Sequence, residues 1–159
     1  MSTVYKDKIV IGRAERVVFP FLGNASLYAR IDTGAKTSSI WATDIVETEN
    51  GLKVRFADSS HRIHSHVRVF KRYDRVRIAS SMGHTQVRFR IKMPVIIKNR
   101  KIMATFTLAD RATQVYSVLI GRNVLLNKFV VDVSQGSPLK HKEIERSKEL
   151  QSTIKKEVI

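Results

Sequence analysis

The sequence contains no cysteine among its 159 residues. This absence excludes a disulfide framework, a thiol nucleophile and a cysteine-ligated zinc site, and it favours a reducing compartment. Long apolar runs are also missing. The N-terminal segment is interrupted by Lys8, Arg13, Glu15 and Arg16, and no run approaches the ~20 residues of a membrane helix. We therefore expect a soluble, cytoplasmic protein without a signal peptide and without a membrane partner.

Acidic residues are scarce relative to basic ones. There are 14 Asp and Glu against 29 Lys and Arg, and the formal net charge is +15. Such a charge attracts nucleic acid, an anionic membrane surface or an acidic polypeptide, although a solvated basic surface is the neutral explanation. Aromatic residues make up only 8%, and no helix-turn-helix, RRM or cold-shock pattern is present. Nucleic acid is therefore the weaker candidate partner, and a non-catalytic module that binds polyanions is the alternative to an enzyme.

The body of the chain, up to about Gly136, alternates apolar and polar residues in the manner of strands. At 43% hydrophobic, the chain can bury a core of its own. Segments 86–97 and 102–110, joined by the short link KNRK, predict a long hairpin. Helix is scarce, and one short helix is predicted over 122–127. The other predicted strands are 8–11, 17–19, 27–31, 40–45, 53–57, 66–70, 75–78, 118–120 and 130–133.

The composition changes after Pro138, where strand-forming residues become rare and charges of both signs mix. The apolar residues of this segment follow a rough helical spacing. We therefore expect a mostly β domain over 1–136 and a C-terminal helix or tail over 137–159.

The sharpest local motif is Asp32-Thr33-Gly34, which follows the predicted strand 27–31. The strand would present the Asp32 carboxylate at its end, and Gly34 permits a tight turn after it. An ordinary Asx-type turn after a strand is the competing interpretation.

Two further motifs accompany it. Leu119-Ile120-Gly121 precedes the short predicted helix, and an ordinary strand followed by a helix N-terminus is one interpretation of it. A turn of small residues, Ser80 to His84, precedes the long hairpin. Its alternatives are an ordinary hairpin loop or a flap that folds over a substrate.

In order and approximate spacing, these three motifs resemble those of retroviral aspartic proteases. The resemblance implies that the strand ending at Gly121 passes close behind the Asp32 loop, where only glycine leaves room for another backbone. The segments IGRAERVVFP, LYARIDTGAKTSSIWA, SSMGHTQVRFRI and LIGRNVLLNKFVVDVS resemble a microbial family still more closely. That family is called RimB-like or retropepsin-like, and also ATP-dependent zinc protease. The resemblance covers nearly the whole body and implies a closed β-barrel of the acid-protease type. Compared with the retroviral enzymes, an insert lies at about 44–73.

The resemblance implies an aspartic peptidase that works as a homodimer, because one D-T-G supplies half of a two-carboxylate site. It implies acidic, poly-glutamate-like protein tails as substrate, which suits the basic charge. We expect Arg30, Lys36, Arg88 and Arg90 to meet acidic side chains. The implied site comprises Asp32, Thr33 and Gly34 as catalytic loop; Ser81, Met82, Gly83, His84, Ala35, Lys36 and Arg88 around the substrate; and Gly121, Arg122 and Asn123 as structural and dimer residues.

No cofactor is expected. The sequence has neither H-E-x-x-H nor a phosphate-binding G-x-x-x-x-G-K-[ST] motif, so the zinc and ATP in the family's alternative name have no support here. His61, His64 and His66 form H-x-x-H-x-H, and on an extended strand the last two would share a face. We interpret this cluster as a surface loop, with a metal site as the alternative.

Overall fold

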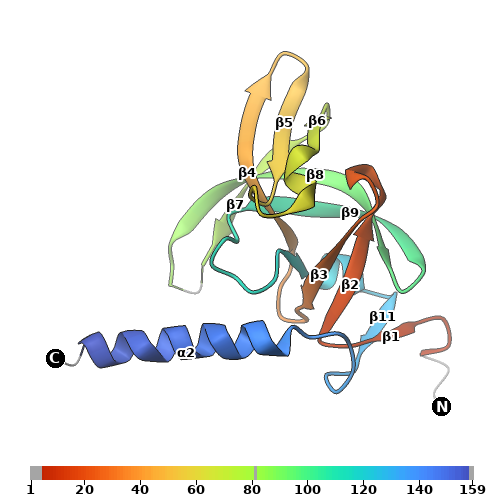
Figure 1. Ribbon diagram of the computed structural model, residues 1–159. Coiled ribbons are helices and arrows are strands. Elements are labelled where there is room, and N and C mark those ends of the chain that lie inside the picture. The colour runs from red at the N-terminus through yellow and green to blue at the C-terminus, as the bar shows by residue number, and fades with distance from the viewer. Residues whose placement is uncertain (1–4, 81, 158–159) are drawn as a thin grey trace.

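The computed structural model describes residues 5–80 and 82–157 (Figure 1). Strands dominate, which confirms the mostly β class. The strands are β1 (Ile9–Ile11), β2 (Ala14–Phe19), β3 (Ala25–Ile31), β4 (Ser38–Thr48), β5 (Gly51–Phe56), β6 (Val67–Phe70), β7 (Asp74–Ala79), β8 (Thr85–Ile97), β9 (Arg100–Ala109), β10 (Val118–Ile120) and β11 (Phe129–Val131). The helices are the 3₁₀ turns η2 (Pro20–Leu22) and η3 (Arg62–Ser65), the short α1 (Arg122–Leu125) and the long α2 (Lys140–Glu157).

The predicted hairpin is confirmed as β8 and β9, which pair antiparallel from Arg90–Thr107 to Ile97–Arg100. The other predicted strands are present too, with shifts of a few residues at their ends. The predicted short helix ends two residues early, because Leu126 leaves the helical conformation and Asn127 has a positive φ of 64°. The strand predicted from residue 66 begins at Val67, since the His66 amide instead donates to Ile63 at the end of η3.

Six strands close into a ring in the order β3-β2-β8-β9-β4-β10, and β10 returns to β3. Alternation along each strand sends one set of side chains into this ring. In β3, for example, Leu27, Ala29 and Ile31 are buried while Arg30 is exposed. The core inside the ring includes an edge-to-face pair of Phe19 and Phe106, with ring centroids 5.6 Å apart. The ring holds the ends of β3 and β10 side by side.

The insert expected at 44–73 forms an extension of the ring. The far half of β4 leaves the ring and pairs with β5, and β5 pairs with β6 (Figure 1). A register shift between Ala42 and Ile45 marks the point of departure. Buried residues Leu52, Val54 and Phe56 on β5 join the same core, so the extension packs as part of the body.

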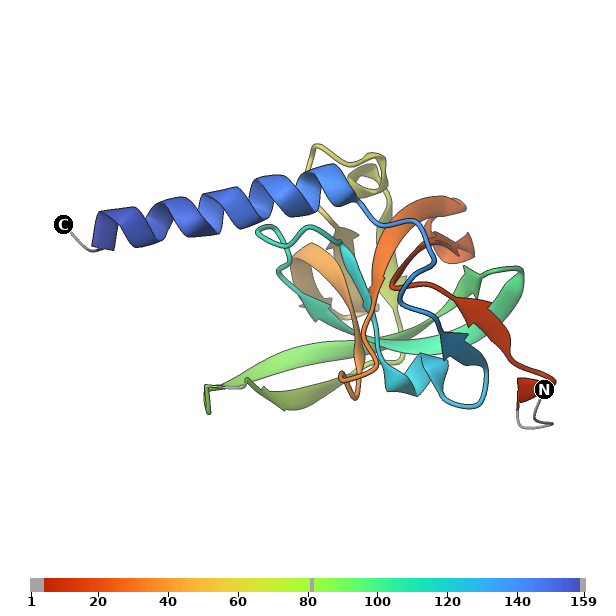
Figure 2. The ribbon, with the colours of Figure 1, turned by 90° about the horizontal axis from the view of Figure 1, so that it is seen from below.

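Two elements project from the body in Figure 2: the β7–β8 hairpin and the helix α2. The C-terminal helix was expected from the sequence, and the structure confirms it over Lys140–Glu157. Its first turns are attached to the body by an ion pair between Arg13 and Glu143 and by a hydrogen bond from the Leu139 amide to the Tyr116 hydroxyl. Within residues 5–80 and 82–157, no helix has the length and apolar character needed to cross a bilayer.

Candidate active site

Asp32 lies at the end of β3, where the chain turns sharply. The Asp32 amide donates to the Ile120 carbonyl at 2.9 Å, which continues the pairing of β3 with β10 by one residue. The Gly34 amide donates to Asp32 Oδ1 at 3.0 Å, and the Ala35 amide donates to the Asp32 carbonyl at 3.3 Å. Asp32 is half-buried. The motif is thus an Asx turn, and that turn holds the carboxylate just beyond the end of β3.

Arg122 holds this loop from behind. Its Nη1 donates to the Gly34 carbonyl at 2.8 Å and to the Thr33 carbonyl at 3.3 Å, while its amide donates to the Ala35 carbonyl at 2.8 Å. The guanidinium therefore binds the loop of its own chain through backbone oxygens. The sequence-based expectation also gave Arg122 a role in a dimer, and that part stays a prediction.

Gly121 lies where two backbones meet. A Cβ at this position would stand 2.3 Å from the Thr37 carbonyl oxygen and 2.8 Å from the Ala35 carbonyl oxygen. Its φ of −103° suits any residue, so the need for glycine is steric. The structure thus shows, behind the Asp32 loop, the close approach that the motif predicted.

Ser38 links two segments behind the Asp32 loop, and the sequence analysis did not single it out. Its fully buried hydroxyl accepts from the Gly121 amide at 2.9 Å and donates to Asn123 Oδ1 at 2.7 Å. Asn123 Nδ2 in turn donates to the Thr105 carbonyl at 3.0 Å. The serine ties the strand after the Asp32 loop to the start of α1. Its only sequence signal is a small polar residue in a run of them, which is too common to single it out.

The turn expected to be a flap is the tip of the β7–β8 hairpin. The Gly83 amide donates to the Ser80 carbonyl at 3.0 Å, and Gly83 has a φ of 79°. Met82 is 81% exposed, the most exposed of the large apolar side chains in the described chain. His84 is exposed too, whereas Ser81 lies outside the described residues. An exposed apolar tip on a long hairpin has the shape that a flap requires.

The basic residues expected to meet a substrate separate into two kinds. Arg90 forms an ion pair with Asp74 on β7 through two hydrogen bonds, so its charge is already compensated. Lys36 and Arg30 are exposed on either side of Asp32 along the chain, and Arg88 is half-buried on β8. Arg111, which the sequence analysis missed, lies close enough to Arg30 and Arg88 for their charges to act on it.

The three histidines line one surface pocket, but each ring has a different neighbour. His64 Nδ1 lies 3.1 Å from the Ala57 carbonyl oxygen, the His61 ring packs edge-on against Trp41, and the His66 ring lies against Gly23. The expectation that His64 and His66 would share one face of an extended strand was wrong, because residues 62–65 form the 3₁₀ turn η3. Among the residues described, no three potential ligands cluster for a metal ion.

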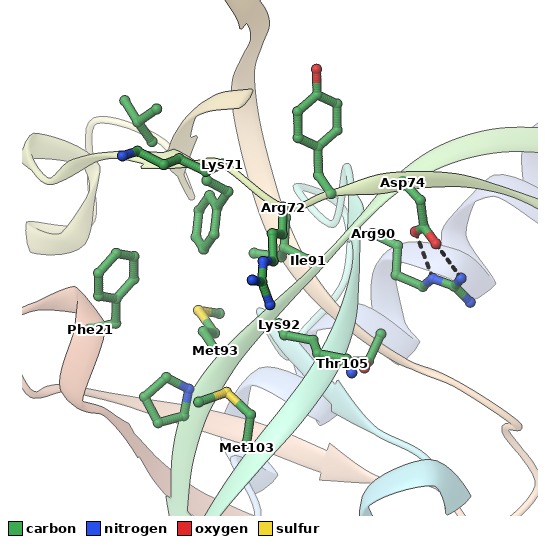
Figure 3. A pocket seen from close by; sticks show the side chains of 14 residues that line it. Phe21, Lys71, Arg72, Asp74, Arg90, Ile91, Lys92, Met93, Met103 and Thr105 are labelled. Atoms are coloured by element: carbon green, nitrogen blue, oxygen red, sulfur yellow. Dashed lines mark hydrogen bonds and ion pairs between the residues drawn. The ribbon is translucent and has the colours of Figure 1, made fainter. Parts of the chain in front are cut away.

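A large cavity lies away from the Asp32 loop (Figure 3). It measures about 940 Å³ and lies between the β6–β7 connection and strands β8 and β9. Apolar side chains such as Phe21, Met93 and Met103 line it beside Arg72 and Lys92, and the Asp74–Arg90 pair lies at one end. No residue of the Asp32 loop is among its walls, so it is no part of the candidate active site.

A closed ring of strands, a D-T-G turn at the end of one of its strands and an apolar-apolar-Gly strand beside that turn define the retropepsin-like class of fold. The family "Retropepsin-like aspartic endopeptidase RimB" matches residues 10–142. The chain belongs to this RimB-like family.

Curated relatives and a solved structure are also similar to this chain. A "Probable alpha-L-glutamate ligase" of Shewanella pealeana is 31% identical over 134 residues, covering 81% of this chain and 29% of the relative. The protein of the same name from Desulfotalea psychrophila is 29% identical over 130 residues, covering 79% of this chain and 28% of the relative. The chain thus spans less than a third of the length of these curated relatives. A crystal structure of a Legionella pneumophila protein of unknown function matches with a TM-score of 0.63 at 20% identity, over 80% of this chain and 95% of that one, and so shares the fold.

Proposed function

We propose that this chain is an aspartic endopeptidase in which Asp32 and the same residue of a second copy form the catalytic pair. The observation that carries the proposal is the fixed position of the Asp32 carboxylate. It lies just beyond the end of β3, accepts a hydrogen bond from the Gly34 amide, and belongs to a loop whose backbone carbonyls bind Arg122. Such rigid support is what a positioned catalytic group requires.

The chemistry needs two carboxylates close together. Two like charges at that distance do not both ionise, so the pair shares one proton and titrates jointly. The ionised carboxylate takes a proton from a water molecule, whose oxygen bonds to the scissile carbonyl carbon. The protonated carboxylate donates to the carbonyl oxygen. The tetrahedral species then collapses, the C–N bond breaks, and the leaving nitrogen takes a proton. One chain has one D-T-G, and a two-fold symmetric dimer would supply the second.

Acidic peptides, such as poly-glutamate tails on proteins, are the proposed substrates. The net charge of +15 favours an acidic chain, and Arg30, Lys36 and Arg88 lie close to the loop in sequence or on the flap hairpin. The printed name of the curated relatives concerns glutamate ligation, so polymers of glutamate are a natural class for a domain that occurs within those proteins.

The test is a cleavage assay with a fluorescent hexaglutamate peptide, read by mass spectrometry. Wild type should cleave it, and Asp32→Asn should lose all cleavage. Asp132→Asn is a matched control, because Asp132 also follows a strand and accepts from the amide two residues on. Cleavage by Asp32→Asn would refute the proposal. Binding of the peptide without cleavage by wild type would support the alternative, a non-catalytic module that binds polyanions.

A further inference from the structure

A second cavity, of about 580 Å³, lies between the ring and the helix α2. Arg30 and Ile31 form part of its wall, and they directly precede Asp32 on β3. The loop after β9 and the first turns of α2 form the other walls, and Figure 2 shows this loop running beneath the helix. The cavity therefore begins on the strand that carries the candidate catalytic residue.

The walls of this cavity carry four arginines and one carboxylate: Arg13, Arg30, Arg111, Arg146 and Glu143. Arg13 binds Glu143 in a bidentate ion pair of 2.8 and 3.0 Å, and Arg146 pairs with Glu149 on its own helix. Within the described part of the chain, neither Arg30 nor Arg111 forms an ion pair with a carboxylate. Neither of these two guanidinium groups is thus directly paired with a carboxylate, although Glu143 lies close enough to Arg30 for their charges to act on each other.

Arg111 is held in place by neutral partners. Its Nε donates to the Tyr116 carbonyl at 2.9 Å, and its Nη1 donates to Ser39 Oγ at 3.4 Å. Burial, together with repulsion from Arg30 and Arg88, lowers the pKa of Arg111 to about 10. The side chain is still charged at neutral pH. A half-buried guanidinium beside two other cations is costly, and a bound anion would offset that cost.

We propose that this cavity is a carboxylate-binding subsite. In it, Arg30 and Arg111 hold a glutamate side chain of an acidic peptide that extends toward Asp32. This assignment rests on the peptidase function proposed above. Glu143 supplies the precedent, because a glutamate carboxylate already binds bidentately to Arg13 in the same cavity. A cavity of about 580 Å³ has room for a side chain. The phosphates of nucleic acid are better served by an open basic surface, which makes nucleic acid the competing ligand.

Binding to the full chain carrying Asp32→Asn tests the subsite separately from cleavage. The probe is fluorescein-labelled hexaglutamate, followed by anisotropy at fixed salt. Arg30→Met and Arg111→Met should each weaken binding about tenfold, as expected for a charge-assisted contact. Arg72→Met is the matched control, because it removes one exposed arginine from the other cavity. It should change the Kd by less than about twofold, as expected for a distant exposed charge.

Equal losses in all three variants, or no loss with Arg30→Met, would overturn the proposal, since binding would then depend on overall charge alone. Should Arg111→Met fail to fold, Arg30→Met decides, because Arg30 is exposed and its loss leaves no cavity. An oligothymidylate of equal charge is the second probe. If the two variants weaken its binding and leave hexaglutamate unaffected, the cavity is a phosphate site and the peptide assignment is wrong. If the wild type does not cleave hexaglutamate but the two arginine variants bind it more weakly, the subsite is supported and the peptidase proposal fails.

Discussion

Gly121→Ala is the sharpest test of how the Asp32 loop is held. The added Cβ would stand 2.3 Å from the Thr37 carbonyl oxygen and 2.8 Å from the Ala35 carbonyl oxygen, and both of these atoms belong to the backbone. Ordinary contact begins at about 3.4 Å, so one of the two segments must move by about 1 Å. The movement would strain the hydrogen bonds from the Arg122 amide to Ala35 and from the Gly121 amide to Ser38.

The cost follows from these contacts. Overpacking costs about 1–3 kcal/mol, and a weakened buried hydrogen bond adds about 1 kcal/mol. We expect Gly121→Ala to lower the free energy of unfolding by about 2–4 kcal/mol in urea titrations. If the chain is a peptidase, a loop displaced by about 1 Å should lower kcat/KM about 100-fold.

Gly83→Ala is the control for stability. A Cβ there meets nothing within 4 Å, and only the positive φ of 79° penalises it. We expect Gly83→Ala to lower the free energy of unfolding by about 1 kcal/mol, because the strain is confined to the hairpin tip. Wild-type stability in Gly121→Ala, or a loss no larger than that of Gly83→Ala, would refute the steric account of this glycine.

Three further predictions follow from the contacts around the site. Ser38→Ala should lower the free energy of unfolding by about 2–3 kcal/mol, measured in urea, because the Gly121 amide and the Asn123 amide oxygen lose their buried partner. Arg13 lowers the pKa of the Glu143 carboxyl below its ordinary value of 4.5, so the pair stabilises the fold above that pH and loses its effect as the pH falls through the lowered pKa. Thermal melts should therefore show Glu143→Gln less stable than wild type at pH 7, with the gap closing as the pH falls below 4.5 and through the lowered pKa; a gap that persists once the carboxyl is protonated would contradict this. EDTA should leave cleavage of an acidic peptide unchanged, since the proposed mechanism uses two carboxylates; loss of cleavage with EDTA and its return with added zinc would redirect attention to the histidines.

The sequence by itself determined the features that depend on near neighbours. Period-two alternation is a local property, so it located the β8–β9 hairpin and the strand before Asp32. The D-T-G turn was predictable because its hydrogen bond spans two residues. The ends of the elements were less predictable from the sequence. The strand β6 begins one residue later than expected because η3 precedes it, and α1 ends before Asn127, which has a positive φ. Both outcomes depend on the packing around short segments.

Only the tertiary structure decided which basic side chains are paired with a carboxylate and which are not. Arg90 is paired with Asp74, whereas Arg111 lies among cations with no carboxylate paired to it in the described chain. Ser38 is buried and binds both Gly121 and Asn123, because the fold brings the end of β10 and the start of α1 to it from more than eighty residues away. Charge compensation and close backbone approach depend on distances in space. A sequence names the charged residues, but the closure of the ring determines which of them meet.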